Sequence, residues 1–179
     1  MIFYNQYLYF GYLCYLWFMN LIIKILSILF ISLLSSPSWS ETLTMDDLVE
    51  RNELYYKKFT DVPFTGEVSG IEKGSFQKGK KNGEWLTFHE SGQLNVKRNY
   101  KDGKTNGVLE IYLENGQLQE KGNYKDGKQD GLQEFYNQNG QLWYKQNYKD
   151  GKKDGLWEYF NEDGSLTRTE SYKDGKLVE

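Results

Sequence analysis

The sequence NYKDGKKDGLWEYFNEDGSL at residues 147–166 repeats, with few changes, the sequence NYKDGKQDGLQEFYNQNGQL at residues 123–142. The same spacing of 24 residues recurs along the chain in columns of aromatic residues, glycines and leucines. Their clearest members are Tyr100, Tyr124, Tyr148 and Tyr172, then Gly103, Gly127, Gly151 and Gly175, then Leu94, Leu118, Leu142 and Leu166. A fixed period of this length indicates a repeat array.

Each repeat contains two turn signals about twelve residues apart. One is Lys-Asp-Gly-Lys, as at residues 125–128, and the other is Asn-Gly or Asp-Gly, as at residues 115–116. Such dipeptides supply the positive φ angles of tight hairpin turns. The segments between them have the length of ordinary strands. The sequence therefore predicts one β-hairpin per repeat, and glycine recurs too often for a helix inside the repeats.

The second strand of each repeat alternates in polarity. Leu118 and Tyr124 are expected on one face, and Lys121 and Asn123 on the other. Aromatic residues make up 17% of the chain, which suits packing on a pleated sheet. We therefore expect an all-β fold, an elongated antiparallel β-meander of 24-residue hairpin repeats over residues 71–179.

Residues 41–70 are expected to form an N-terminal cap that includes a degenerate repeat. Thr44 and Asp47 have capping-box spacing, although Asp replaces the usual Glu or Gln. This pair predicts a short helix within residues 44–51. A strand is expected to follow from Leu54.

Residues 1–40 form a hydrophobic leader, expected to be helical, whose only charged side chain is Lys24. From Met19, a possible translation start, the order of a basic residue, an apolar run and small residues is typical of a secretory signal. It predicts cleavage near Ser40 and export to the periplasm, the cell surface or the medium. Alternatively, the apolar stretch is long enough to remain as a membrane anchor.

The composition argues against several classes of function. A net charge of -3 and a pI near 5.4 disfavour nucleic-acid binding. Cys14 is the single cysteine, so neither a disulfide nor a cysteine-based metal site is expected after the leader. His89 has no apparent catalytic partner, and the Asp residues before Gly suit turns better than calcium sites. We expect no cofactor, no metal and no enzymatic activity.

The repeat pattern G-K-x-x-G-x-W-x-x-Y/F-x-x-x-G-x-L, best seen at residues 151–166, resembles the bacterial variant of the MORN repeat. Residues 54–70, LYYKKFTDVPFTGEVSG, are similar to the first segment of YwqK-family antitoxins. The resemblance covers residues 48–179. It implies an array of β-hairpins, and, given the leader, an antitoxin-like or immunity-like role toward a target in the envelope. Leu109 and Gln133 replace the tryptophan in the middle repeats.

Aromatic side chains are the candidate interaction surface, because a sheet of one layer cannot bury both faces. The candidates are Trp85, Tyr112, Tyr136, Trp143, Trp157 and Phe160. The alternative is that these rings pack on each other between neighbouring hairpins. Glu110, Glu134 and Glu158 are expected in register on one face, where Lys121 and Lys145 can pair with them across strands.

Two functions fit these observations. The first is a non-catalytic scaffold, exported or membrane-tethered, that binds another protein. The second is a cell-envelope binding module that recognises glycan or a lipid surface through aromatic rows.

Overall fold

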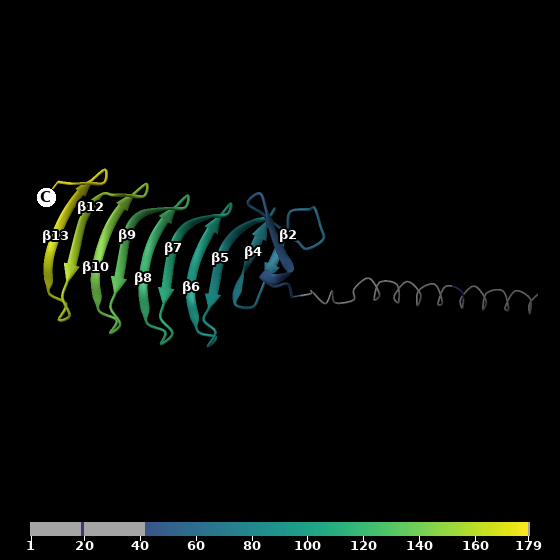
Figure 1. Ribbon diagram of the computed structural model, residues 1–179, viewed down its shortest axis with the longest axis horizontal. Coiled ribbons are helices and arrows are strands. Elements are labelled where there is room, and N and C mark those ends of the chain that lie inside the picture. The colour runs from purple at the N-terminus through teal and green to yellow at the C-terminus, as the bar shows by residue number, and fades with distance from the viewer. Residues whose placement is uncertain (1–18, 20–41, 179) are drawn as a thin grey trace, which may run out of the picture. The chain divides into compact units, whose positions relative to one another are not determined.

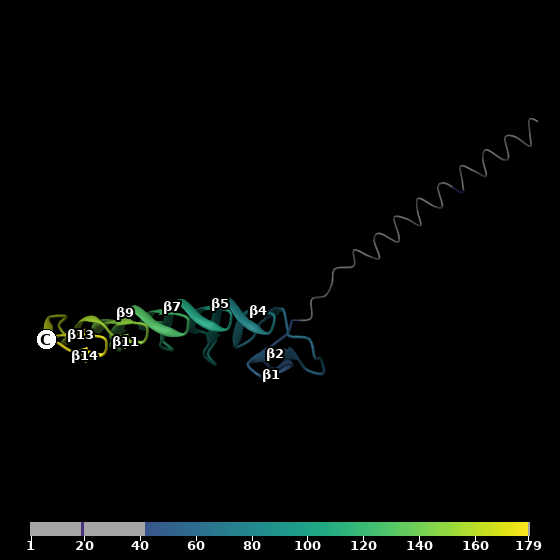
Figure 2. The ribbon, with the colours of Figure 1, turned by 90° about the horizontal axis from the view of Figure 1, so that it is seen from above.

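The computed structural model describes Met19 and residues 42–178. The expected leader helix and cleavage site, residues 1–40, lie outside the described part of the chain apart from Met19. Thr42–Glu179 forms one compact unit. Within it, an antiparallel sheet of 12 strands forms a single layer (Figures 1 and 2), which confirms the expected all-β meander. None of the helices in the described residues has the length and apolar character needed to span a bilayer.

The strands of the array follow each other in the order of the sequence. They are β3 (Gly66–Val68), β4 (Glu72–Gln77), β5 (Lys80–Phe88), β6 (Leu94–Lys101), β7 (Lys104–Tyr112), β8 (Leu118–Lys125), β9 (Lys128–Tyr136), β10 (Leu142–Lys149), β11 (Lys152–Lys153), β12 (Gly155–Phe160), β13 (Leu166–Lys173) and β14 (Lys176–Leu177). Consecutive strands pair with each other, except that β11 and β12, two segments of one strand position, both pair with β10. The strands are therefore connected as successive hairpins.

The short helix expected within residues 44–51 is a single turn. A single 3-10 turn, η1 (Met45–Asp47), is followed at once by strand β1 (Leu48–Arg51), which pairs with β2 (Leu54–Lys57). The Asp47 carboxylate accepts hydrogen bonds from the backbone N–H and the hydroxyl of Thr44, at 2.8 and 2.9 Å. The Thr–Asp pair thus begins a helical turn, but pairing between β1 and β2 captures the next residues.

Two-residue turns of Asp and Gly line one edge of the sheet. Asp102 and Gly103 have φ angles of 51° and 82°, the signature of a type I′ hairpin turn. The Gly103 N–H donates a hydrogen bond of 2.9 Å to the carbonyl of Lys81 in the preceding repeat. Equivalent bonds join Gly127 to Thr105, Gly151 to Gln129 and Gly175 to Lys153. These turns are therefore stacked on each other as well as closing their own hairpins.

At the opposite edge, each turn is accompanied by a bulge. In the second repeat, Gly116 has a φ angle of 81°, and the register shifts by one residue between Ile111 and Tyr112. Tyr112 consequently pairs with Leu118, and Gln119 is skipped. The predicted alternation is confirmed from Glu120 to Tyr124, but it is interrupted at Leu118 and Gln119, because the bulge breaks the pleat there.

One face of the sheet, here called the packed face, buries large side chains. At its N-terminal end, Leu48 of β1 and Tyr55 of β2 pack with Phe76 and Trp85 in one core. Among the described residues of the later repeats, the side chains are buried against neighbouring strands of the same sheet. Trp85 lies flat over Gly74, where any Cβ would overlap the indole, and its Nε1–H donates to the carbonyl of Ser75 at 3.1 Å. Gln133 lies over Gly122 in the same way and donates to the carbonyl of Asn123 at 2.8 Å. Each planar group is thus buried against the preceding strand.

In the alternate repeats, a longer polar side chain replaces the glycine and turns toward a tyrosine. Arg98 Nη1 donates to the Tyr100 hydroxyl at 3.1 Å, and the Tyr148 hydroxyl donates to Gln146 at 3.4 Å. Trp157 packs beside Gln146 and donates to the carbonyl of Asn147 at 3.1 Å. A glycine and a long hydrogen-bonding side chain are therefore two solutions to the same packing position.

Lysines cover two of the tryptophans on the packed face. Lys81 Nζ lies 4.0 Å from the ring centroid of Trp85, and Lys153 Nζ lies 3.9 Å from that of Trp157. Such cation–π contacts favour a partly buried ammonium group. They leave Trp85 and Trp157 only 3% and 4% exposed.

Gln133 is the weak point of this packing, because its Oε1 is buried without a hydrogen-bond partner. We predict that Gln133→Trp raises the free energy of unfolding by about 1–2 kcal/mol, since an indole over Gly122 would repeat the Trp85 arrangement and remove the unpaired oxygen. Urea denaturation measures the change. Adding Gly122→Ala to this variant should reverse the gain, and a gain that persisted would contradict the packing.

Glu120 provides a test by pH. Burial on the packed face raises the pKa of the Glu120 carboxyl, and Arg98 opposes that rise. Because the unfolded chain ionises first, this carboxyl destabilises the fold as the pH rises through the unfolded and then the folded pKa. We predict that Glu120→Gln is more stable than the wild type at pH 7 and that this advantage disappears at pH 3. Urea denaturation at both pH values measures it, and an advantage independent of pH would contradict the assignment.

Candidate functional site

Trp85 and Trp157 do not present a surface to a partner. Both rings are buried on the packed face, with centroids 4.9 Å from Phe76 and 4.9 Å from Tyr172, respectively. For these two residues the structure favours packing between neighbouring hairpins over contact with a partner. The sequence did not separate the possibilities, because a tryptophan in a strand has the same pattern in either case.

Three other candidates meet on the opposite face, here called the polar face. Tyr136, Trp143 and Phe160 line a groove of about 540 Å³ near the bulged ends of β9, β10 and β12. The rim of this groove, here called the Trp143 groove, is polar and consists of Gln119, Asn137, Gln138, Asn161 and Glu162. Side chains from three successive repeats therefore build one concave site.

A bulge accounts for the exposure of Trp143. The register between β9 and β10 shifts between Leu142 and Tyr144, so that Trp143 has no cross-strand partner there. Its side chain is 57% exposed and contacts the ring of Tyr144, with centroids 5.1 Å apart. The equivalent positions in the other repeats are Asn95, Gln119 and Thr167. The aromatic groove is therefore a feature of one place in the array.

Tyr112 occupies the same column as Tyr136 but lies outside the groove. Its hydroxyl donates a hydrogen bond of 3.0 Å to Glu110. Burial, and then this bond, raise the pKa of Tyr112. The phenol therefore stays protonated and holds the Glu110 carboxylate in place.

A ladder of alternating charges crosses the polar face beside the groove. Its members, Lys97, Glu110, Lys121, Glu134, Lys145 and Glu158, lie directly opposite one another on successive strands. Lys121 Nζ lies 3.2 Å from Glu110, and Lys145 Nζ lies 2.9 Å from Glu158. The predicted cross-strand pairing is confirmed for both lysines.

His89 is partly buried at the first bulged turn. Its Nε2 lies 3.0 Å from the backbone carbonyl of Tyr112 in the next repeat. In the described part of the chain, no three His, Cys, Asp and Glu side chains are grouped so that they could hold a metal ion. The histidine thus links adjacent turns.

Sequence reasoning missed the rim of the groove. Gln119 and Gln138 come from different repeats, and only the pairing of β8, β9 and β10 brings them near Trp143. Their signal in the sequence was weak, because Gln is common on exposed strand faces. Periodicity could only have placed them at the same edge of the sheet.

Comparison with known proteins identifies the family of the repeats. Four segments match the family described as the MORN repeat variant: residues 81–102, 105–126, 129–150 and 153–174. No curated protein matches the sequence significantly.

Two solved structures are similar to part of the chain. One is a mutant of S. aureus TarM in complex with fondaparinux, alpha-GlcNAc-glycerol and UDP, with 16% identity and a TM-score of 0.37 over 63% of this chain and 20% of that chain. The other is TarM itself, with 15% identity and a TM-score of 0.36 over 64% of this chain and 21% of that chain. The chain thus spans about a fifth of those structures. The four consecutive matches, each a hairpin of the meander, show that the chain is a MORN-repeat protein of the variant type.

Proposed function

We propose that the protein is a non-catalytic scaffold that binds another protein through the Trp143 groove. The observation that carries the proposal is a large exposed indole at the centre of a concave aromatic site. Tryptophan and tyrosine in such sites dominate the binding energy of many protein interfaces. The polar rim around the groove is typical of the edge of an interface.

An exposed leucine beside the groove favours a protein partner. Leu166 pairs with Phe160, which lines the groove, and is 52% exposed. An aliphatic side chain contributes little to stacking on a sugar ring, but it fits the apolar side chains of a protein. Together with the aromatic groove, Leu166 extends the apolar contact area beyond the indole.

A neutral glycan is the second candidate for the same site. The amide side chains of Gln119 and Gln138 stand at the rim of an aromatic platform, where they can exchange hydrogen bonds with hydroxyl groups. The nearby Lys145 is paired with Glu158, so the groove offers no unpaired lysine from the ladder to an anionic sugar. An uncharged polysaccharide is therefore the form of glycan that fits.

Two more specific proposals, an immunity-like role and export, rest on the sequence. The similarity of residues 54–70 to YwqK-family antitoxins, together with the secretory pattern of residues 19–40, supports an immunity-like protein whose partner acts in the envelope. We propose export with cleavage near Ser40, and the alternative is retention as a membrane anchor.

Replacement of Trp143 tests the binding site. We predict that Trp143→Ala weakens binding of the protein partner about 30-fold or more, as expected for loss of a central anchor. Quantitative co-purification of the full chain from its own cells identifies the stoichiometric partner and measures its retention. Asn95→Ala, at the equivalent position two repeats earlier, is the matched control and should retain the partner.

The outcomes separate the two candidates. Full retention of the partner by Trp143→Ala would contradict the proposal. If purified neutral cell-wall polysaccharide binds the wild type but not Trp143→Ala, and no stoichiometric protein is found, the glycan alternative replaces it.

The site of export is tested separately. We predict that the chain isolated from fractionated cells begins at Glu41 and occurs in the envelope or secreted fraction, because Ser38 and Ser40 are suitable small residues before the cleavage site. Intact mass and N-terminal sequencing measure this. A chain that begins at Met1 or Met19 and stays with membranes would establish the anchor instead.

A further inference from the structure

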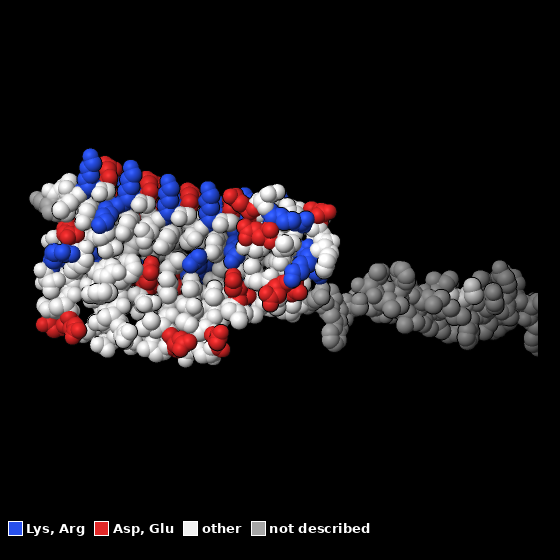
Figure 3. Space-filling model, in the orientation of Figure 1, with Lys and Arg blue, Asp and Glu red and all other residues white. Residues whose placement is uncertain are grey.

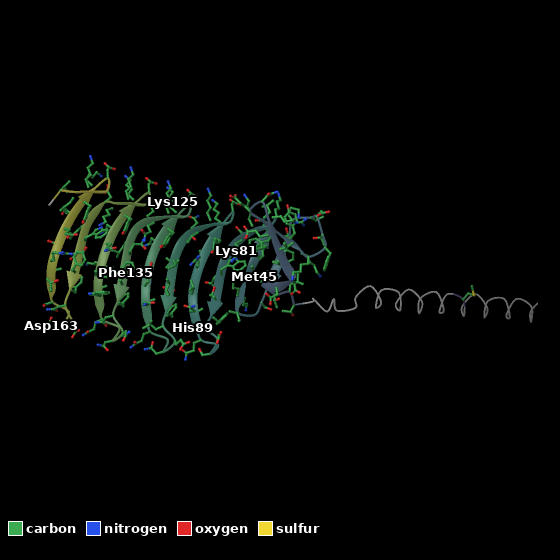
Figure 4. All side chains as sticks on the ribbon, viewed as in Figure 1. Met45, Lys81, His89, Lys125, Phe135 and Asp163 are labelled. Carbon is green, nitrogen blue, oxygen red and sulfur yellow. The ribbon has the colours of Figure 1, made fainter. Side chains whose placement is uncertain are left out.

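Lysines line the edge of the sheet where the two-residue turns are stacked. Four turns of sequence Lys-Asp-Gly-Lys contribute the members of this row, here called the lysine edge: Lys101, Lys104, Lys125, Lys128, Lys149, Lys152, Lys173 and Lys176. All eight are exposed, and Figure 3 shows their row along one edge, with Lys125 pointing outward in Figure 4. With the four turn aspartates included, these turns carry a net charge of +4.

The opposite edge is acidic. Its bulged turns, residues 89–93, 113–117, 137–141 and 161–165, contain Glu90, Glu114, Glu162 and Asp163 and no Lys or Arg. Asp163 lies at this edge in Figure 4. The net charge of -3 for the whole chain therefore conceals a separation of charge across the sheet.

Most of the lysine edge is not neutralised by neighbouring acids. In the described residues, the ion pairs within 4 Å involve one of the eight lysines, Lys173, which lies 3.0 Å from Asp154. The lysines of the ladder on the polar face differ in this respect, since Lys97, Lys121 and Lys145 each have a carboxylate partner. The lysine edge therefore keeps most of its positive charge, whereas the positive charge of the ladder on the polar face is neutralised by paired carboxylates.

The fold holds these charges at a regular spacing. Each turn is hydrogen-bonded to the preceding repeat through its glycine N–H, as Gly127 is to Thr105 and Gly151 is to Gln129. Adjacent turns are two strands apart, about 10 Å in an antiparallel sheet. This distance is close to the Debye length of about 8–10 Å at physiological ionic strength, so the fields of neighbouring turns overlap.

We propose that the lysine edge binds an extended polyanion, a single polymer chain that carries phosphate or similar groups along its length. A line of ammonium groups matches a linear chain of negative charges, and release of counterions supplies the binding energy. Each turn consists of Lys, Asp and Gly alone, and has no aromatic or aliphatic side chain to enter a bilayer. An anionic membrane is therefore the less suitable occupant.

This site is independent of the Trp143 groove. The groove lies at the acidic edge beside Asn137, Asn161 and Glu162, at the other ends of the strands. Loss of one binding activity need not affect the other. The two proposals can therefore fail separately.

The test measures binding of fluorescent long-chain inorganic polyphosphate to the full chain by anisotropy over a range of salt concentrations. The principal variant replaces Lys104, Lys128, Lys152 and Lys176 with Gln, which removes the net charge of the four turns. We expect affinity at low salt to fall at least tenfold. The slope of log K against log salt should become shallower by about 3, from about 0.7 per neutralised charge.

Two matched variants serve as controls. The four corresponding Lys→Arg changes keep the charge and should keep the affinity within a few-fold. The double change Glu114→Gln and Glu162→Gln makes the chain less acidic at the far edge and should leave polyphosphate binding nearly unchanged. Thermal unfolding verifies that each variant folds.

Three results would overturn the proposal. One is that the wild type does not bind polyphosphate at low salt. Another is that the four Lys→Gln changes leave binding intact. The third is that vesicles of anionic phospholipid or duplex DNA bind the lysine edge more tightly than polyphosphate does, which would assign it to a different partner.

Discussion

Beyond the N-terminal end, where β1 and β2 pack on Phe76 and Trp85, a sheet of one layer must bury its side chains against its own neighbouring strands. The rest of this structure depends on that constraint. Trp85 and Gln133 satisfy it by lying flat over a glycine and donating a hydrogen bond to the adjacent backbone. Trp157 does so beside a glutamine that turns toward Tyr148. Because each contact joins one repeat to the preceding one, stability is distributed along the array, as in other repeat proteins.

The same constraint decides which surfaces remain for binding. The packed face buries two of the three tryptophans in the described residues, Trp85 and Trp157, and the charge ladder crosses the polar face. Trp143 belongs neither to the packed face nor to the charge ladder. A bulge at the start of β10 leaves it without a cross-strand partner on β9 and exposed. The lysine edge remains exposed as well, since the backbone of its turns bonds along the array. The array thus offers a localised aromatic groove and an extended charged edge.

Much of the fold follows from the sequence, because the turn chemistry is explicit. An Asp-Gly pair with both φ angles positive can form a two-residue hairpin, and its recurrence every 24 residues leaves one simple topology, the meander. The pairing of Lys121 with Glu110 also follows from strand alternation. The short helix expected within residues 44–51 forms a single turn with its capping pair, but its end at Asp47 did not follow from the sequence, because it is set by the pairing of β1 with β2.

The candidate site was less predictable, for physical reasons. Trp85 and Trp143 both lie within strands, and their immediate neighbours in the sequence do not distinguish them. The glycine at position 74 and the bulge before Tyr144 decide that one is buried and the other exposed. Pattern alone cannot locate a bulge to the residue. The lysines of the lysine edge recur plainly in the sequence. The net charge of the whole chain does not reveal that they gather at one edge of the sheet.

The most direct measurement of the central claim is hydrogen exchange of the indole N–H groups by NMR. The Nε1–H groups of Trp85 and Trp157 donate to backbone carbonyls on a buried face, whereas the Trp143 ring is mostly exposed. The account predicts strong protection of the first two and rapid exchange of Trp143. Equal, rapid exchange of all three would contradict it, because the packed face would then not be held together by these lateral contacts.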